Sequence, residues 1–150
     1  MTTANLVTNT GTPVLSPEFL NDTQYNKQPV LLVEDDGALR RYLQLTLERN
    51  GFEVITARDG LDATNKLMSH SFSLVVTDAM MPRMTGYDLC RFVRRNEKLS
   101  SLPVILLSGL DHDDWDNEQS SEERANVYLS KPVSPDDLVC HLKQLLPGVL

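Results

Sequence analysis

The sequence predicts an α/β fold, a doubly wound sheet of five parallel strands with helices on both faces. Continuous apolar runs of strand length alternate with segments whose apolar residues recur at helical spacing. Runs without a polar alternation are typical of strands buried on both faces, as in a parallel sheet between two helical layers. Right-handed crossovers then distribute the helices over the two faces.

The length and charge fit a single domain that does not bind nucleic acid directly. The chain has 150 residues, 41% of them apolar, and a net charge of −7. Most of the excess negative charge lies in 111–126, which contains seven acidic residues and one basic residue, Arg124. An acidic chain without a basic footprint lacks the counter-charge that phosphate backbones require.

We expect a mobile N-terminal tail over 1–28, one folded domain over 29–147 and a short C-terminal end, 148–150. The tail shows no helical or strand period and no signal-peptide pattern, and no apolar run reaches membrane-spanning length. Cys90 and Cys140 lie in apolar helical patterns and are expected to be buried thiols of a cytoplasmic protein.

The first half of the domain begins with the strand 29–33. The helix that follows has Asp36 as its N-cap and ends at Asn50-Gly51; its apolar face is Leu39, Tyr42, Leu43, Thr46 and Leu47. A short strand is expected over 52–57. A helix over 61–70 should then turn Ala63, Leu67 and Met68 inward.

The second half begins with the strand 74–78, followed by a loop over 81–86 and a helix over 87–96 whose buried face is Leu89, Phe92, Val93 and Asn96. Strands are expected over 103–107 and 127–129. The last helix begins with Ser134 as N-cap and Pro135 at its first position, and carries the apolar residues Leu138, Val139, Leu142, Leu145 and Leu146.

Polar side chains follow four of the predicted strands: Glu34 and Asp35, Asp78, Ser108, and Lys131. Parallel strands bring their carboxyl ends to one edge, so these groups should meet. Three carboxylates repel one another unless a cation joins them, and an open oxygen site suits Mg²⁺. A lysine and a hydroxyl can balance a phosphoryl group, which leaves Asp78 as a nucleophile that forms an acyl phosphate.

Each of these residues has an ordinary explanation when taken singly. Asp78 could cap a turn, the acidic run at 34–36 could favour a helix dipole, and Lys131 could be a surface lysine. Their joint placement, each at the end of its own strand, favours a common site.

At these residues the sequence resembles the receiver domain of two-component response regulators. The matching stretches are Val30 to Asp36, Leu74 to Asp78 with Met81-Pro82 and Gly86, Leu102 to Ile105 with Ser108, and Tyr128 to Pro132. The resemblance spans roughly residues 28–146. It implies the flavodoxin-like strand order 2-1-3-4-5.

The resemblance also implies a role for each matched residue. Asp78 would be the phosphoacceptor, Asp35 a direct Mg²⁺ ligand, Glu34 a ligand acting mainly through water, and Met80 a ligand through its backbone carbonyl. Asp36 is the alternative ligand if the register slips by one residue. Ser108 and Tyr128 would be the switch residues, and Lys131 would bind the phosphoryl group and precede a cis peptide bond to Pro132.

The implied function is signal transduction in a phosphorelay. A histidine kinase or phosphotransfer protein would phosphorylate Asp78, and Ser108 and Tyr128 would then shift between two existing arrangements and change a surface that binds an unknown downstream protein. No membrane or direct nucleic-acid partner is expected, and the protein should be a monomer or weak dimer.

The segment 111–125 departs from the family, in which a fourth helix occupies this place. It has no apolar stripe, so we predict an atypical, frayed or irregular segment; a solvated helix pinned by Trp115 is the alternative. The arginines of the third helix, Arg91, Arg94 and Arg95, with Lys98, are expected to be solvated, although docking to an acidic partner is open.

Two other functions compete with a phosphorylated receiver. One is an interaction module that keeps the fold without phosphorylation, a pseudo-receiver, which the odd 111–125 segment favours. The other is a Mg²⁺-dependent phosphohydrolase with an Asp nucleophile. Such enzymes need a second Asp two residues after the nucleophile, and Met80 stands there. Turnover of external substrates, and hence an enzyme, is therefore not expected.

Overall fold

The computed structural model describes residues 28–109 and 122–147, and its five parallel strands form one sheet in the order β2-β1-β3-β4-β5. The predicted fold class and strand order are therefore confirmed. The strands are β1 (Val30–Val33), β2 (Val54–Ala57), β3 (Leu74–Asp78), β4 (Val104–Ser108) and β5 (Val127–Ser130). The helices of the described residues are α3 (Gly37–Arg49), α4 (Gly60–Ser69), α5 (Gly86–Arg95) and α7 (Pro135–Leu145).

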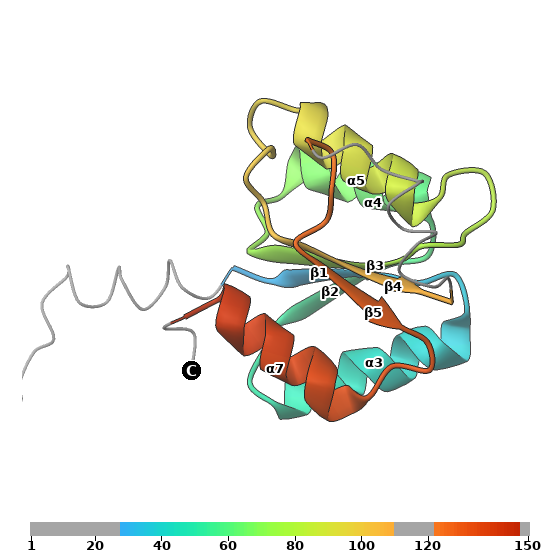
Figure 1. Cartoon of the computed structure of the whole chain (residues 1–150), viewed down its shortest axis with the longest axis vertical. Helices are drawn as coiled ribbons and strands as arrows, with labels where there is room; N and C mark the ends of the chain where they lie inside the picture. The colour runs from blue at the N-terminus through green and yellow to red at the C-terminus, as the bar shows by residue number, and fades with distance from the viewer. Residues whose placement is uncertain (1–27, 110–121, 148–150) are drawn as a thin grey trace, which may run out of the picture.

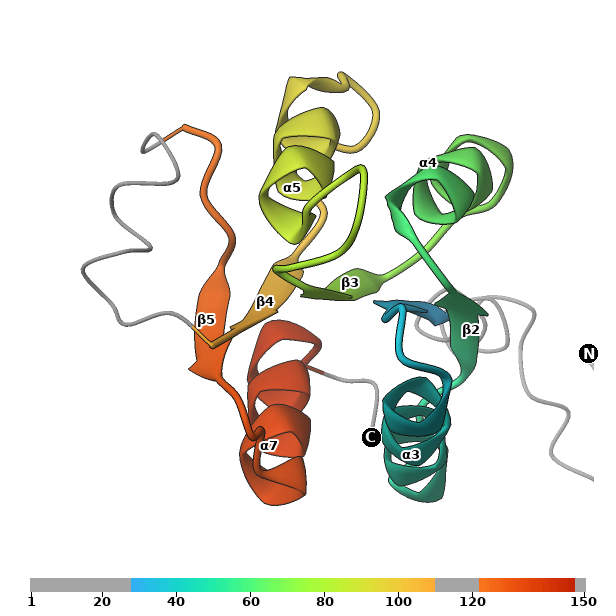
Figure 2. The same cartoon turned by 90° about the vertical axis from the view of Figure 1, so that its right-hand side faces the viewer.

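Helices cover both faces of the sheet: α4 and α5 pack on one face, and α3 and α7 on the other (Figures 1 and 2). The central strands β1, β3 and β4 are buried at every position. Their side chains alternate between two cores, with Leu31 and Val33 toward α4 and α5, and Val30 and Leu32 toward α3 and α7. This two-sided burial explains the continuous apolar runs in the sequence.

Local signals set the helix ends. Asp36, Asp59, Thr85 and Ser134 each cap a helix by accepting a hydrogen bond from a backbone N–H in its first turn. Thr85 and Asp88 exchange such bonds reciprocally and form a capping box. After α3, Gly51 adopts a φ of 94°, a left-handed conformation that a residue without Cβ adopts easily.

Three predicted burials are wrong. Met68 is 63% exposed, and Tyr42 is 51% exposed. In each case the adjacent leucine, Leu67 or Leu43, is buried instead. Successive side chains on a helix point about 100° apart around its axis, so the neighbour of a buried leucine can face solvent. Cys140 is also exposed, next to the buried Val139 of α7, whereas Cys90 is buried as expected.

Most of the 111–125 segment lies outside the described residues, and so does Trp115. The predictions of a frayed segment or a solvated helix therefore stay predictions, as does the expected tail. None of the helices in residues 28–109 and 122–147 is long and apolar enough to span a membrane.

Candidate functional site

Three carboxylates meet at the carboxyl edge of the sheet, the edge seen in Figure 2. β1 leads directly into Glu34 and Asp35, and β3 ends at Asp78. One carboxylate oxygen from each residue lies within 4.8 Å of the others. Glu34 and Asp78 are 1% and 4% exposed, whereas Asp35 is exposed. The pocket therefore has two deep acids and one acid that faces solvent; we call these three residues and Lys131 the acidic pocket.

Lys131 supplies the positive charge of the acidic pocket. It follows β5, and its Nζ lies 2.9 Å from Asp78 Oδ1 and 3.4 Å from Glu34 Oε1. Burial alone would lower the pKa of Lys131, but its hydrogen bond to Asp78 and the charges of Glu34 and Asp78 raise the pKa above 10.5. The ammonium group therefore stays charged. The Lys131–Pro132 peptide bond is cis, as the resemblance implies.

Glu34 has a strongly raised pKa. Burial raises its pKa to about 7; the hydrogen bond from Asp36 N–H and the charge of Lys131 oppose this rise, and the charge of Asp78 adds to it. The three acids of the acidic pocket outnumber its one lysine. Arg40, which was not predicted as a site residue, donates from Nη1 to Glu34 O at 2.8 Å and fixes the turn that follows β1.

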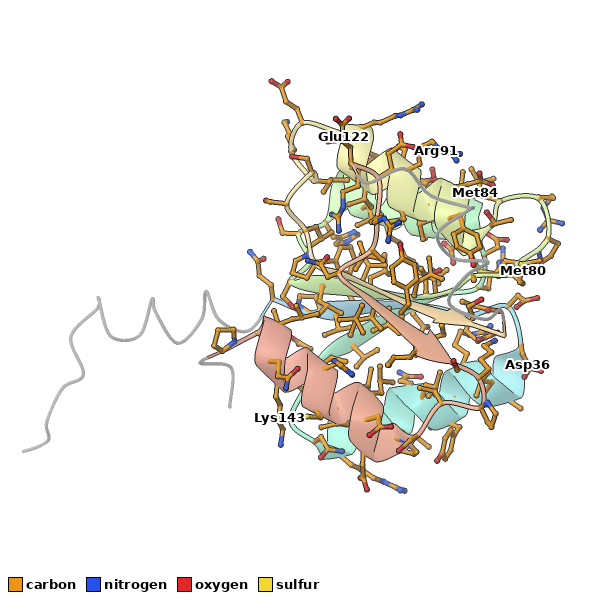
Figure 3. All side chains as sticks on the ribbon, viewed as in Figure 1. Asp36, Met80, Met84, Arg91, Glu122 and Lys143 are labelled. Atoms are coloured by element: carbon orange, nitrogen blue, oxygen red, sulfur yellow. The ribbon has the colours of Figure 1, made fainter. Side chains whose placement is uncertain are left out.

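The loop after β3 folds back onto the nucleophile candidate. Met80 N donates to Asp78 Oδ1 at 3.2 Å, and Gly86 N donates to Ala79 O at 2.8 Å. A Cβ on Gly86 would lie 2.2 Å from Asp78 O, so only glycine permits this approach. Figure 3 shows Met80 and Asp36 at this same end of the molecule.

Asp36 takes a different role from its neighbour Asp35. Its Oδ1 accepts a hydrogen bond from Leu39 N at 2.9 Å, which caps α3. The cluster of carboxylates contains Asp35 and not Asp36. The geometry therefore favours the register in which Asp35 belongs to the acidic pocket.

Ser108 ends β4, and Tyr128 lies within β5. The fully buried Ser108 accepts a backbone hydrogen bond from Lys131 N at 2.9 Å, and its hydroxyl lies 3.4 Å from the hydroxyl of the buried Tyr87. Tyr87 was not predicted as a site residue; its place beside Gly86 at the start of a helix was the only sequence signal. The half-buried Tyr128 accepts from Ala125 N at 3.1 Å, and burial raises its pKa.

The donor set of the acidic pocket fits a hard divalent cation. Three carboxylates offer oxygen ligands, which Mg²⁺ prefers, and the exposed Asp35 leaves room for the waters that Mg²⁺ retains. Burial and, to a smaller extent, the charge of Asp78 raise the pKa of Glu34, and a bound cation would oppose both by favouring the ionised carboxylate.

A doubly wound sheet of this order with acids and a lysine at its carboxyl edge defines the class of receiver domains. The model of the response regulator receiver domain matches residues 30–143, and the chain belongs to this family. Receiver domains are signalling modules of two-component regulators rather than enzymes that turn over substrates.

Relatives and solved structures agree with this assignment. The chain is 36% identical to the transcriptional regulatory protein GltR of Pseudomonas aeruginosa, over 81% of this chain and 50% of that protein. It is 34% identical to the protein PilG of the same species, over 79% and 87% of the two chains. The signal receiver domain of a histidine kinase from Syntrophus aciditrophicus superposes with a TM-score of 0.74 at 34% identity, over 81% and 92%. The chain spans about half the length of GltR.

Proposed function

We propose that the domain accepts a phosphoryl group on Asp78 from a histidine kinase or a phosphotransfer protein and passes the signal to a downstream protein. The convergence of Glu34, Asp35 and Asp78, with Lys131 2.9 Å from Asp78, carries this proposal. The proposed working unit is 29–147, and its proposed place is the cytoplasm. The absence of direct nucleic-acid binding by this domain and its state as a monomer or weak dimer stay predictions.

Glu34, Asp35 and Asp78 would hold Mg²⁺, with the backbone carbonyl of Met80 as a further ligand. When bound, the ion balances negative charge on the phosphoryl oxygens. It would also leave Lys131 free to exchange its contact with Asp78 for one with the phosphoryl group, because the carboxylates would no longer depend on the ammonium alone.

The transfer needs no further reactant. A carboxylate oxygen of Asp78 attacks phosphorus and forms the O–P bond of an acyl phosphate, while the N–P bond of the donor phosphohistidine breaks. The imidazole nitrogen leaves with the electron pair and takes up a proton. Lys131 binds an equatorial oxygen of the phosphoryl group through the transfer, which in such reactions is chiefly a matter of position and charge.

The response to phosphorylation would pass through β4 and β5. Ser108 exchanges its contact with Tyr87 for one with the phosphoryl oxygen, and Tyr128 moves into the space that Ser108 leaves. The surface around β5 changes shape, and the downstream protein binds one arrangement better than the other.

Labelling with acetyl phosphate tests the proposal. The native protein should gain one phosphoryl group, detected by intact mass, only with Mg²⁺ present, and Asp78→Asn should gain none. Asp88→Asn is a control, because Asp88 belongs to the capping box of α5 and is not one of the three carboxylates that meet. Labelling of Asp78→Asn at the native level would refute Asp78 as acceptor. A native protein that is never labelled would favour the phosphorylation-independent module.

A further inference from the structure

The arginines of α5 are only partly solvated: the Arg95 side chain is 69% exposed and that of Arg91 38%, and all three arginines also hold the residues that lead into β5. Arg91, Arg94 and Arg95 contact residues 123–126, which lie beside α5 (Figure 3). We call these three arginines with residues 123–126 the arginine clamp. It binds a polar segment to α5.

Glu123 forms one half of the arginine clamp. Arg91 Nε lies 3.3 Å from Oε1 and Arg95 Nε lies 2.5 Å from Oε2, so both carboxylate oxygens are held. The Glu123 side chain is only 17% exposed. Partial burial would raise its pKa, but the hydrogen bonds and charges of Arg95 and Arg91 lower it below 4.5. The backbone is held as well, because Cys90 Sγ donates to Glu123 O at 3.2 Å.

Arg94 forms the other half. Its Nε donates to Arg124 O at 2.9 Å, and its Nη2 donates to Asn126 Oδ1 at 2.7 Å. Asn126 is tied in turn to β4, since its Oδ1 accepts from Val104 N at 2.8 Å. The residues on both sides of Ala125 are therefore fixed to α5 and to the sheet.

Ala125 joins the arginine clamp to the switch tyrosine. Its side chain is buried, and its N–H donates to the Tyr128 hydroxyl at 3.1 Å. Because Glu123, Arg124 and Asn126 are held, this N–H has little freedom to follow the phenol if the ring moves. Movement of Tyr128 must then either break the hydrogen bond or loosen the clamp.

We propose that Glu123, Arg91 and Arg95 are positioning residues for Tyr128, and that the arginine clamp holds the tyrosine in its resting position. This inference rests on the proposed function in assigning Tyr128 to the switch. The clamp fixes the Ala125 N–H, the N–H fixes the phenol, and the resting arrangement gains a hydrogen bond that the shifted arrangement lacks. A ligand or modification must overcome this difference, because an equilibrium moves only by differential interaction.

Fluorine NMR of protein labelled with 3-fluorotyrosine tests the clamp without phosphorylation. The chain has four tyrosines, and Tyr128→Phe identifies the Tyr128 signal. In the resting protein, Glu123→Gln and Arg95→Gln should each shift or broaden that signal. Glu122→Gln is the matched control, because Glu122 is the exposed neighbour of Glu123 and loses the same charge; it should leave the signal unchanged. Figure 3 shows Glu122 at the outside of the molecule.

Labelling rates then separate positioning from a merely structural effect. Glu123→Gln should raise the rate with acetyl phosphate and Mg²⁺ about two- to fivefold, in line with the loss of one neutral hydrogen bond from the resting state. In a Tyr128→Phe background the same substitution should have no effect, because the phenol that it releases is gone.

The outcomes are distinguishable. If neither Glu123→Gln nor Arg95→Gln moves the Tyr128 signal, the clamp does not position the tyrosine. If Glu123→Gln fails to fold, the exposed Arg95 decides alone, since its side chain is 69% exposed and its loss leaves the core intact. If beryllofluoride, a mimic of the phosphoryl group, with Mg²⁺ does not change the Tyr128 signal of the native protein, the proposed switch is wrong. The effect of the clamp substitutions on the resting protein can still be measured in that case.

Discussion

The acidic pocket and the arginine clamp are both clusters of charged side chains beside β5, but their charge balance is opposite. In the acidic pocket three carboxylates share one lysine, and two of the acids are buried. In the arginine clamp Arg91 and Arg95 contact the one glutamate, Glu123, and Arg94 donates to neutral oxygens. The first cluster has more acids than bases, whereas the second has more bases than acids.

This difference separates a site suited to binding a cation from a site that stabilises the fold. Buried carboxylates with too little counter-charge cost folding free energy until a cation arrives, and such strain is typical of functional sites. Arginines that meet a carboxylate and backbone carbonyls stabilise the fold and prepare no chemistry. Without Mg²⁺, removal of an acid from the acidic pocket should therefore raise the free energy of unfolding, and removal of a clamp residue should lower it.

The largest effect should come from Asp35→Asn. This change removes a proposed metal ligand, and even an outer-shell partner of a metal costs about 10- to 100-fold in affinity or activity, so labelling at limiting Mg²⁺ should fall by about 100-fold or more. The matched control is Asp36→Asn, because asparagine also caps helices and Asp36 accepts its bond from Leu39. Labelling rates over a Mg²⁺ titration decide. Equal losses in both variants would restore Asp36 as a ligand.

The pH dependence of stability in the absence of Mg²⁺ should show the cost of burying Glu34 in the acidic pocket. The pKa of Glu34 is raised from 4.5 to about 7, so between these values the folded state binds more protons than the unfolded state. Without Mg²⁺ the free energy of unfolding should fall as pH rises from about 4.5 to 7, by on the order of 3 kcal/mol.

Urea unfolding across this pH range, with EDTA and with Mg²⁺, measures the effect. Glu34→Gln should flatten the slope in EDTA, and Mg²⁺ should reduce it in the native protein, because a cation favours the ionised carboxylates. A free energy of unfolding that rises with pH through this window in EDTA would contradict the assigned direction of the Glu34 shift.

Arg94→Gln should test the opposite cluster. Arg94 bonds Arg124 O, Leu102 O and Asn126 Oδ1, and its loss leaves these oxygens without their charged donor. We expect a loss of about 2–3 kcal/mol in the free energy of unfolding, at the level of a hydrogen bond to a charged group with its desolvation. Arg41→Gln, on the exposed side of α3, is the control and should change stability by less than about 0.5 kcal/mol. Equal melting curves for Arg94→Gln and Arg41→Gln would show that the arginine clamp does not stabilise the fold, and would contradict its contrast with the acidic pocket.

The sequence predicted the sheet and its carboxyl edge because both depend on local signals. Continuous apolar runs mark buried parallel strands, and the polar residues at the ends of four of them mark the edge, so Asp78 and Lys131 could be placed without coordinates. The helix caps Asp36 and Ser134 were also predicted, since capping depends on the first turn alone.

The misses have a different origin. The arginine clamp joins α5 to residues about 30 positions further along the chain, and no spacing rule connects Arg94 with Asn126. Tyr87 meets Ser108 through the pairing of α5 with β4, which a helical pattern does not show. Met68 was misplaced because an apolar side chain at the border of a helix face can turn either way.

The smallest effect should be at acid pH. The pKa of Glu34 in the acidic pocket is raised, whereas the pKa of Glu123 in the arginine clamp is lowered, so the two groups change stability with pH in opposite directions. The lowered pKa of Glu123 gives stability that is fully present above 4.5 and is lost as pH falls through the folded-state pKa. Glu123→Gln should therefore make the acid limb of the stability curve shallower, without abolishing it, because the pKa values of Asp62 and Asp88 are lowered too. Thermal melts below pH 5 measure the limb, with Glu122→Gln as the control. If both substitutions flatten the acid limb equally, the effect comes from general surface charge. Glu123 then gains no more stability from its arginines than the exposed Glu122 gains in solvent.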